Sequence, residues 1–169
     1  EDIESNKNYS KSSNYFVVIF HPVLNEFKNI KYQTDNLLSS IKKFKTINFY
    51  WIFPNNDMGH NIILNQLNKK KTKNLKIIKN LERDSFIKML SNSKGIIGNS
   101  SCGIIEASKF PIPVINIGSR QNGRPQSKNI INTEYNEKEI STAIKKILNQ
   151  KFLKKILNNV MSPYYKKNS

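Results

Sequence analysis

The chain has 169 residues and a formal net charge of +16, a length that suits one domain whose core needs no disulfide or metal. One cysteine and two histidines exclude an intrachain disulfide and a zinc site, and no apolar run reaches the roughly 18 residues of a membrane span. The charge comes from 25 lysines and three arginines, beside 25 asparagines and 24 isoleucines, with the lysines spread along the chain. This composition is typical of an A/T-rich genome, so we do not expect nucleic acid as a partner.

The first 14 residues are polar and have no hydrophobic period, so residues 1–14 are expected to form a linker or flexible entry segment. Because the chain begins with Glu1 and not with Met, we expect it to start within a longer protein. Short apolar runs rich in β-branched and aromatic residues then predict strands buried on both faces, at residues 15–20, 47–53, 75–78, 95–98, 114–117 and 129–131.

Segments with the helical period separate these runs. Apolar residues share one helical face within residues 37–44, 63–67, 86–90 and 140–148, and Asn136 with Glu139 resembles a capping box before the last of these. The alternation predicts the α/β fold class over residues 15–150, with a parallel sheet and helices on both faces. Residues 151–169 are expected to form a C-terminal helix over 151–160 and an incomplete tail, with Pro163 ending the helix.

The sequence GNSSCGIIEA, residues 98–107, lies where the fourth strand ends. Ligands of parallel sheets bind at the carboxyl ends of the strands, and the N-terminus of a following helix favours an anion. Ser100 and Ser101 add hydroxyl donors and Gly103 lets an anion approach the backbone, so a phosphate is the expected ligand. Glu106, in the first turns of the expected helix, would then accept hydrogen bonds from a sugar diol. The structural alternative is that a serine caps the helix and Glu106 complements its dipole.

Polar residues also follow the first two strands at the same predicted edge. His21 comes directly after the first strand, although an isolated histidine is more often a structural side chain. Asn55 follows the second strand as an adaptable donor, in FPNNDMGH. In the same stretch Asp57 is expected to cap a helix, and His60 is expected to lie inside that helix with a solvent or packing role.

The loop after the fifth strand, GSRQNGR, holds Arg120 and Arg124, two of the three arginines of the chain. The planar guanidinium of arginine matches the geometry of phosphate. Because arginine is scarce here, codon bias does not explain its presence at these positions. The sequence therefore predicts a contact of this loop with an anionic ligand.

Four motifs, FHPV, FPNNDMG, GNSSCGIIEA and PVINIGSRQNGR, together resemble the hydrolysing UDP-N-acetylglucosamine 2-epimerases, the enzymes that open sialic acid biosynthesis. The resemblance covers the C-terminal half of that family, from residue 15 to residue 164. It implies a GT-B arrangement, in which two Rossmann-like domains face each other across a cleft and this chain would be the second. The N-terminal domain would be the missing partner, and the full enzyme would be cytoplasmic and could form a homo-oligomer.

Carried over position by position, the resemblance implies a set of residues that contact a UDP-sugar. They are His21 near the diphosphate, Asn55 in the nucleotide pocket, Ser100, Ser101 and the Gly103 amide on the diphosphate, Glu106 on the ribose hydroxyls, Arg120 on the phosphates, and the backbone around Leu81 beside the uracil. His21 is the expected catalytic residue of this half, and the family implies no metal and no cofactor.

The family's reaction is anti-elimination of UDP from UDP-N-acetylglucosamine, followed by hydration to N-acetylmannosamine. The carboxylates that move the proton at C2 belong mostly to the first domain of relatives, so this chain alone is expected to bind UDP without turnover. Four alternatives stay open: a non-hydrolysing epimerase, whose loop reads more like TDSGGIQEE, a hydrolysing epimerase of a UDP-linked diacetamido-trideoxy hexose, a GT-B glycosyltransferase, and a basic nucleic-acid-binding domain.

Overall fold

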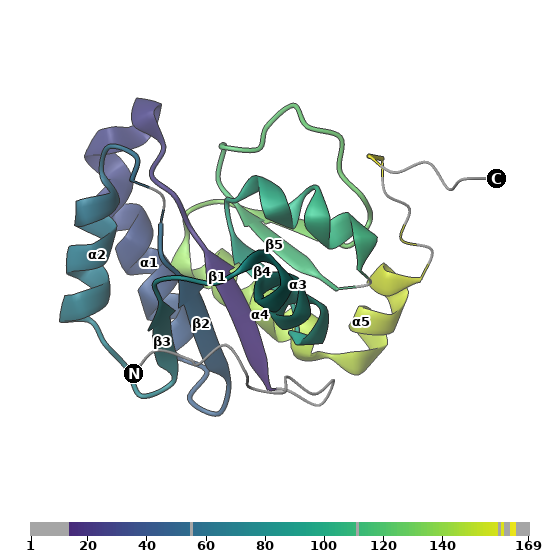
Figure 1. Ribbon diagram of the computed structural model, residues 1–169. Coiled ribbons are helices and arrows are strands. Elements are labelled where there is room, and N and C mark those ends of the chain that lie inside the picture. The colour runs from purple at the N-terminus through teal and green to yellow at the C-terminus, as the bar shows by residue number, and fades with distance from the viewer. Residues whose placement is uncertain (1–13, 55, 111, 159, 161–162, 165–169) are drawn as a thin grey trace.

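A computed structural model describes residues 14–54, 56–110, 112–158, 160 and 163–164 (Figure 1). The elements in chain order are β1 (Tyr15–Ile19), η1 (Leu24–Asn29), α1 (Ile30–Lys42), β2 (Asn48–Ile52), α2 (His60–Lys69), β3 (Leu75–Ile78), α3 (Arg83–Asn92), β4 (Ile96–Gly98), η2 (Ser101–Gly103), η3 (Glu106–Lys109), β5 (Val114–Ile117), β6 (Ile130–Thr133), α4 (Glu137–Leu148) and α5 (Gln150–Leu157), where η marks a 3-10 helix.

The six strands form one sheet in the order β3-β2-β1-β4-β5-β6, and every neighbouring pair is parallel. This is the strand order of the Rossmann fold, and the predicted α/β class with a parallel sheet is confirmed. Strands β2 and β3 lie on one side of β1, and β4, β5 and β6 lie on its other side. The direction in which successive strands are added therefore reverses between β1 and β4. Ligands of such sheets bind at this switch point, beyond the carboxyl ends of the two strands.

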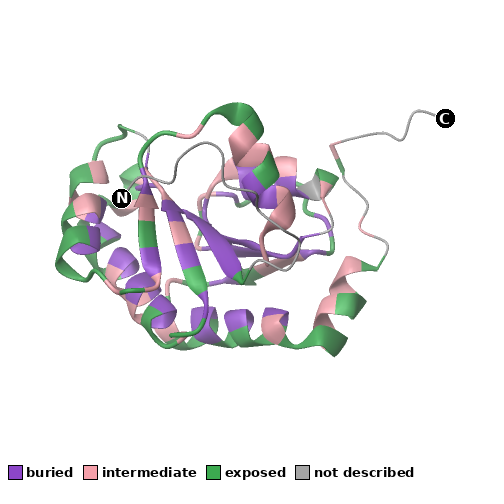
Figure 2. Ribbon diagram, turned by 60° about the horizontal axis from the view of Figure 1, so that its bottom comes forward, coloured by how far each residue is buried: buried purple, intermediate pink, exposed green. Residues whose placement is uncertain are grey.

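The core consists of two layers, one on each face of the sheet. The even-numbered residues from Phe16 to Phe20 pack in a cluster with α1, α2 and α4, and the odd-numbered residues from Tyr15 to Ile19 pack with α3 and the η2–η3 segment. Alternate side chains of β1 therefore supply both layers, as expected of a strand buried on both faces. Figure 2 shows the strands mostly buried at the centre, with exposed residues on the outer sides of the helices.

The predicted strands are confirmed within one or two residues at each end, and α4 begins at the predicted cap. The Asn136 side chain accepts hydrogen bonds from the amides of Lys138 and Glu139, at 2.9 and 3.1 Å. The Glu139 carboxylate accepts from the Glu134 amide instead of from Asn136, so only half of the capping box forms. The C-terminal helix, predicted over 151–160, is α5 and ends earlier, at Leu157.

Two predictions about helix starts are wrong. The segment after β4 forms the short turns η2 and η3 in place of one regular helix. The physical reason is that Gly103 and two β-branched isoleucines disfavour a long helix, while Ile104 and Ala107 are completely buried and hold the segment against the sheet. At α2, the N-cap is Gly59 in a left-handed conformation, not Asp57, whose backbone carbonyl accepts from the His60 amide at 3.0 Å.

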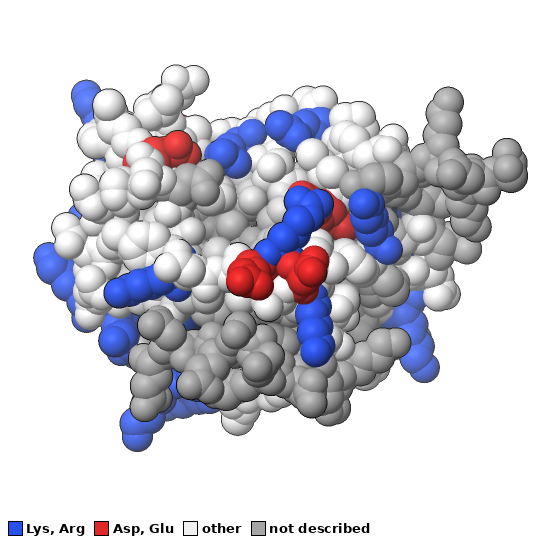
Figure 3. All heavy atoms as spheres, in the orientation of Figure 1, with Lys and Arg blue, Asp and Glu red and all other residues white. Residues whose placement is uncertain are grey.

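Positive charge is scattered over the surface. On the face shown in Figure 3, lysine and arginine side chains lie near the outline and also near the centre, and acidic side chains lie among them. This distribution agrees with the interpretation of the lysines as a compositional effect. Within the described ranges, no helix is both long enough and apolar enough to cross a bilayer.

Candidate functional site

Asn99, the first residue after β4, joins the ends of β1 and β4 at the switch point. Its side-chain oxygen accepts from the His21 amide and its side-chain nitrogen donates to the His21 carbonyl, both at 2.8 Å. Asn99 has no exposed surface, so these two bonds satisfy backbone groups that water does not reach. The side chain thereby fixes the position of His21 relative to β4.

Gly98 lets the two strands approach this closely. Its φ is +144°, and a Cβ atom placed there would lie 1.9 Å from the Ile19 carbonyl oxygen. Any side chain at this position would therefore push β4 away from β1. The switch point depends on this glycine as much as on the asparagine that follows it.

His21 is a neutral histidine at physiological pH. The residue is only 6% exposed, and burial, followed by the positive charge of Arg120, lowers its pKa from 6.5 to about 4, against the opposing effect of Asp57. A neutral imidazole offers one donor and one acceptor. His21 can therefore orient a polar ligand at the end of β1 without carrying a charge.

The loop after β5 brings a cation to the same point. Arg120 Nη1 and Gln121 Nε2 both donate to the Asn99 carbonyl, at 3.2 and 2.8 Å. The guanidinium of Arg120 is half-buried and close enough to His21 to lower its pKa, whereas Gln121 is fully enclosed. Asn99 thus receives hydrogen bonds from β1 and from the β5 loop, and three strand ends meet around it.

The turn after Asn99 contains the serines predicted to bind a phosphate. Ser100 is the N-cap of η2, and its hydroxyl accepts from the Cys102 amide at 3.4 Å, so the capping interpretation holds for this residue. The Gly103 amide, predicted to hold a diphosphate, donates to the Ser100 carbonyl at 3.1 Å. The half-buried Ser101 hydroxyl has no hydrogen-bond partner among the residues that the structure describes, which leaves it available for a ligand.

Glu106 and Cys102 flank this turn. Glu106 is half-buried and is the first residue of η3. Because η3 is a short 3-10 helix and only a short turn precedes it, the dipole of a regular helix is absent there. Cys102 is buried, and its burial and the Glu106 charge raise its pKa to about 11, although Ser100 and the Gly103 amide oppose the rise. The cysteine is therefore a protonated core residue and not a nucleophile.

Leu81 lies in the loop after β3, on the far side of β2 from His21, where it packs on the layer that contains α3. Asn55 lies outside the described residues. The structure therefore brings His21, Ser100, Ser101 and Arg120 together around the switch point, with Glu106 in the following turn. Leu81 is at the same edge of the sheet, but two strands away from the switch point.

Sequence reasoning left Asn99, Gln121 and Glu26 out of the site. Asn99 directly follows β4, Gln121 lies in the loop after β5, and both are buried polar residues. Glu26 accepts hydrogen bonds from Ser119 and Gln33. Their position after strands was a visible signal for Asn99 and Gln121. For Glu26 no local signal existed, since its partner Ser119 is 93 residues away.

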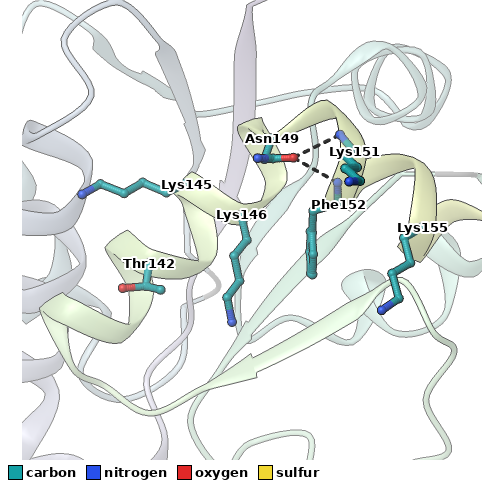
Figure 4. A pocket seen from close by; sticks show the side chains of 7 residues that line it. All are labelled: Thr142, Lys145, Lys146, Asn149, Lys151, Phe152 and Lys155. Carbon is teal, nitrogen blue, oxygen red and sulfur yellow. Dashed lines mark hydrogen bonds between the residues drawn. The ribbon is translucent and has the colours of Figure 1, made fainter.

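A separate pocket of about 510 Å³ lies between the end of α4 and the start of α5 (Figure 4). It is lined by Phe152 and by four exposed lysines, Lys145, Lys146, Lys151 and Lys155. Because α4 follows β6 and returns antiparallel to the strands, this pocket lies at the amino edge of the sheet, opposite Asn99. Lysines in the last turn of α4 complement its dipole, which is a sufficient structural reason for them.

A metal centre finds no support in the described part of the chain, where no three histidine, cysteine, aspartate or glutamate side chains gather in a way that could hold an ion. The donors at the switch point are instead amide, hydroxyl, imidazole and guanidinium groups. Such groups bind oxyanions by hydrogen bonds and charge.

Sequence comparison matches the whole chain, residues 1–169, to the family described as UDP-N-acetylglucosamine 2-epimerase. The chain is 33% identical over 157 residues to the polysialic acid biosynthesis protein P7 of Escherichia coli, covering 92% of this chain and 40% of that protein. It is 35% identical over 139 residues to the hydrolysing UDP-N,N'-diacetylbacillosamine 2-epimerase of Legionella pneumophila, covering 82% of this chain and 37% of that protein. The chain thus spans about two fifths of the length of these relatives.

Among solved structures, the UDP-GlcNAc 2-epimerase of Neisseria meningitidis bound to UDP-GlcNAc superposes with a TM-score of 0.73 at 16% identity. The match covers 92% of this chain and 42% of that chain. At this identity the likeness establishes the fold alone, and it confirms the predicted Rossmann-like domain. The coverage is that expected of one domain in a two-domain GT-B enzyme.

Proposed function

The chain belongs to the UDP-N-acetylglucosamine 2-epimerase family, and from this premise we propose that it binds the UDP part of a UDP-sugar at the carboxyl edge of its sheet and serves a hydrolysing epimerase. The observation that carries the proposal is the convergence of three strand ends on Asn99. His21, Ser101 and Arg120 follow these strand ends, and they offer a neutral imidazole, a hydroxyl without a hydrogen-bond partner among the described residues, and a guanidinium.

The proposed contacts follow the chemistry of the groups. Arg120 and Ser101 bind the diphosphate, because one brings positive charge and the other a hydroxyl without a partner in the described chain. The short turn around Ser100 and Gly103 lies against the same oxygens, with the Gly103 amide shared between the Ser100 carbonyl and the ligand. His21 donates from the other side as a neutral group.

The nucleoside then extends along the sheet edge. Glu106, one turn beyond the serines, accepts hydrogen bonds from the ribose hydroxyls, and the backbone around Leu81 flanks the uracil. A carboxylate beside a diphosphate would repel it, so Glu106 has to face the sugar diol. Asn55 is proposed to line the nucleotide pocket on the strength of the resemblance alone.

In the proposed reaction, elimination of UDP generates negative charge on the departing diphosphate. Donors that already point to that position stabilise the charge without reorganising, a contribution that reaches several kcal/mol in comparable sites. Arg120 and Ser101 would supply this stabilisation, and His21 would orient the β-phosphate. Hydration of the resulting glycal then gives the free 2-epimer, with UDP-N-acetylglucosamine converted to N-acetylmannosamine.

A second substrate is favoured by one specific observation, the 35% identity to a protein named as a hydrolysing UDP-N,N'-diacetylbacillosamine 2-epimerase. The same cradle for UDP would serve that substrate, because the two sugars differ away from the diphosphate. The two candidate substrates can be distinguished by product analysis with both UDP-sugars. This experiment uses a protein of the full length of the relatives. Release of a free sugar supports hydrolysis, and a UDP-linked epimer would show the non-hydrolysing type.

The direct test of the proposal uses this chain. Since it spans about two fifths of its relatives, we expect it to bind UDP but to release none from a UDP-sugar by itself. Calorimetry with UDP measures the binding, and a coupled assay for UDP measures the turnover. The absence of binding at millimolar UDP would contradict the binding proposal, and turnover by the chain would contradict the proposed inactivity.

A further inference from the structure

Glu26, on the η1 turn after β1, joins three segments that are far apart in sequence. One carboxylate oxygen accepts a hydrogen bond from the Ser119 hydroxyl, and the other accepts from Gln33 Nε2 of α1 at 2.6 Å. Ser119 belongs to the loop after β5, directly before Arg120. The carboxylate therefore fixes the β5 loop to the segment that leaves β1.

The start of the same loop is covered by Tyr135. Gly118 has φ +72°, and a Cβ atom there would lie 2.0 Å from Cζ of the Tyr135 ring. The Tyr135 carbonyl accepts from Asn36 Nδ2 of α1 at 2.7 Å, and its ring lies edge-on to Phe20. The loop thus leaves β5 beneath the Tyr135 ring. Ser119 is the first residue of the loop that is hydrogen-bonded to Glu26.

The other side of the loop is held at the switch point. Arg120 and Gln121 donate to the Asn99 carbonyl, so the backbone between Gly118 and Gln121 is fixed by Glu26 on one side and by Asn99 on the other. Among the ion pairs of the described residues, none joins Glu26 to Arg120. The acid therefore holds the loop through a neutral hydroxyl and does not pair with the charge of Arg120.

We propose that Glu26 is a positioning residue, whose carboxylate holds Ser119 so that the neighbouring Arg120 keeps its guanidinium beside His21, where it faces the diphosphate. A direct pair of Glu26 with Arg120 would cancel the charge that an anionic ligand needs. A charge-assisted bond to Ser119 gives the same restraint and leaves that charge free. The proposal rests on the proposed function only in taking a diphosphate as the partner of Arg120.

The ionisation of Glu26 is consistent with this role. Burial raises its pKa, but the hydrogen bond from Ser119, the nearby Tyr135 hydroxyl and the hydrogen bond from Gln33 outweigh burial, so its pKa lies below the ordinary value. Burial and the Glu26 carboxylate raise the pKa of Tyr135, which therefore stays protonated. At neutral pH the network consists of one carboxylate surrounded by neutral donors.

His21 reports the position of Arg120 without any ligand. The charged groups that act on its pKa are Arg120, which lowers it, and Asp57, which raises it. The chain has only two histidines, so NMR titration resolves His21 and uses His60 as an internal control. Removal of a negative charge would by itself lower the His21 pKa, whereas withdrawal of Arg120 would raise it, so the sign separates the two effects.

The test compares Glu26→Ala, which removes the charge, with Ser119→Ala, which removes the same hydrogen bond and keeps the charge. Both variants are expected to raise the His21 pKa by roughly half a unit to one unit. The rise should not exceed that of Arg120→Ala, and Glu26→Gln, which keeps an acceptor, should show a smaller rise. Added to Arg120→Ala, neither change should raise the His21 pKa further.

Three results would overturn the proposal: a lowered or constant His21 pKa in Glu26→Ala, a constant pKa in Ser119→Ala, or the same rise in the Arg120→Ala background. Because Ser119 is exposed, its variant tests the idea even where Glu26→Ala does not fold. The parallel arm is calorimetry, where both variants should bind UDP and pyrophosphate about fivefold more weakly, with no added loss in Arg120→Ala. If the unaltered chain binds no UDP, the proposed function fails while the His21 result still decides the role of Glu26.

Discussion

The two edges of the sheet both carry positive charge, but they hold it in different ways. At the carboxyl edge, Arg120 is half-buried and donates to the Asn99 carbonyl, next to a histidine whose pKa it lowers. At the amino edge, the pocket between α4 and α5 is lined by lysines such as Lys146 and Lys155, which are exposed (Figure 4). The carboxyl edge therefore has one cation that is held by a hydrogen bond, whereas the amino edge has several exposed cations on flexible side chains.

The difference shows why charge abundance is a poor guide to the site in a lysine-rich chain. A lysine side chain has many rotamers and stays hydrated, so it loses entropy when it binds. The guanidinium of Arg120 is already held, so a ligand meets it without that cost. We therefore expect substitutions of Asn99 and of the residues around it to have large effects on stability or ligand binding. Substitutions of the lysines that line the pocket between α4 and α5 should have almost none.

The largest expected effect is the loss of the Asn99 side chain. Asn99→Ala leaves the amide and the carbonyl of His21 buried without partners, which should lower the free energy of unfolding by roughly 2–5 kcal/mol. Urea unfolding measures this loss. The control is Asn65→Ala, an exposed asparagine of α2 whose side chain has no hydrogen-bond partner among the described residues, and for which less than about 1 kcal/mol is expected. Equal losses in the two variants would contradict the special role of Asn99.

The next effect is the pH dependence that His21 imposes. Its folded pKa of about 4 lies below the ordinary 6.5, so its contribution to stability is complete above pH 6.5 and is lost as the pH falls through 4. The shift corresponds to a loss on the order of 3 kcal/mol. The pKa of Glu26 lies below its own ordinary value, so the change in stability in the upper part of this pH range comes from His21 and not from Glu26. Urea midpoints between pH 7 and 4 should fall in the unaltered chain and change much less in His21→Gln.

The residues proposed to contact UDP should differ in their effects on the affinities for UDP and for pyrophosphate. Glu106→Ala is expected to weaken UDP binding by roughly 1.5–3 kcal/mol per lost charge-assisted bond, while pyrophosphate binding stays unchanged or becomes slightly tighter. Ser101→Ala should weaken both ligands. Titration calorimetry at fixed salt compares the four combinations. If Glu106 only complements the turn, its replacement would reduce the affinities for UDP and pyrophosphate equally.

The smallest effect is expected in the lysine pocket. The pair of changes Lys145→Gln and Lys146→Gln removes two charges at the end of α4, and stability should change by no more than about 0.5 kcal/mol each. UDP affinity should stay within about twofold of the unaltered chain, because the pocket lies at the opposite edge. A loss of UDP affinity as large as that of Arg120→Ala would remove the distinction between the edges.

Much of the fold could be predicted from the sequence because most strands consist mainly of apolar residues. The run 114–117 coincides with β5, whose residues are all buried. The segment after β4 could not be predicted in the same way, since burial of Ile104 and Ala107 against the sheet selects short turns there. Local propensity says nothing about that contact, which forms only once β4 and β5 are paired.

The site was predictable to the extent that it follows strand ends. His21, Ser100 and Arg120 come after β1, β4 and β5, so a parallel sheet alone brings them to one edge. The hydrogen bonds that fix them were not predictable. The bonds of Asn99 to His21 span 78 residues and that of Ser119 to Glu26 spans 93, and no pattern in the sequence links such distant polar groups.

The most direct test of the central claim is an NMR titration of the isotope-labelled chain with UDP, observing backbone amides at both edges of the sheet. We expect the amide signals of residues 99–103 and 119–121 to shift together and to saturate, while the signals of residues 145–155 do not shift. Shifts confined to residues 145–155, or no shifts at millimolar UDP, would contradict the assignment of the nucleotide site to the switch point around Asn99.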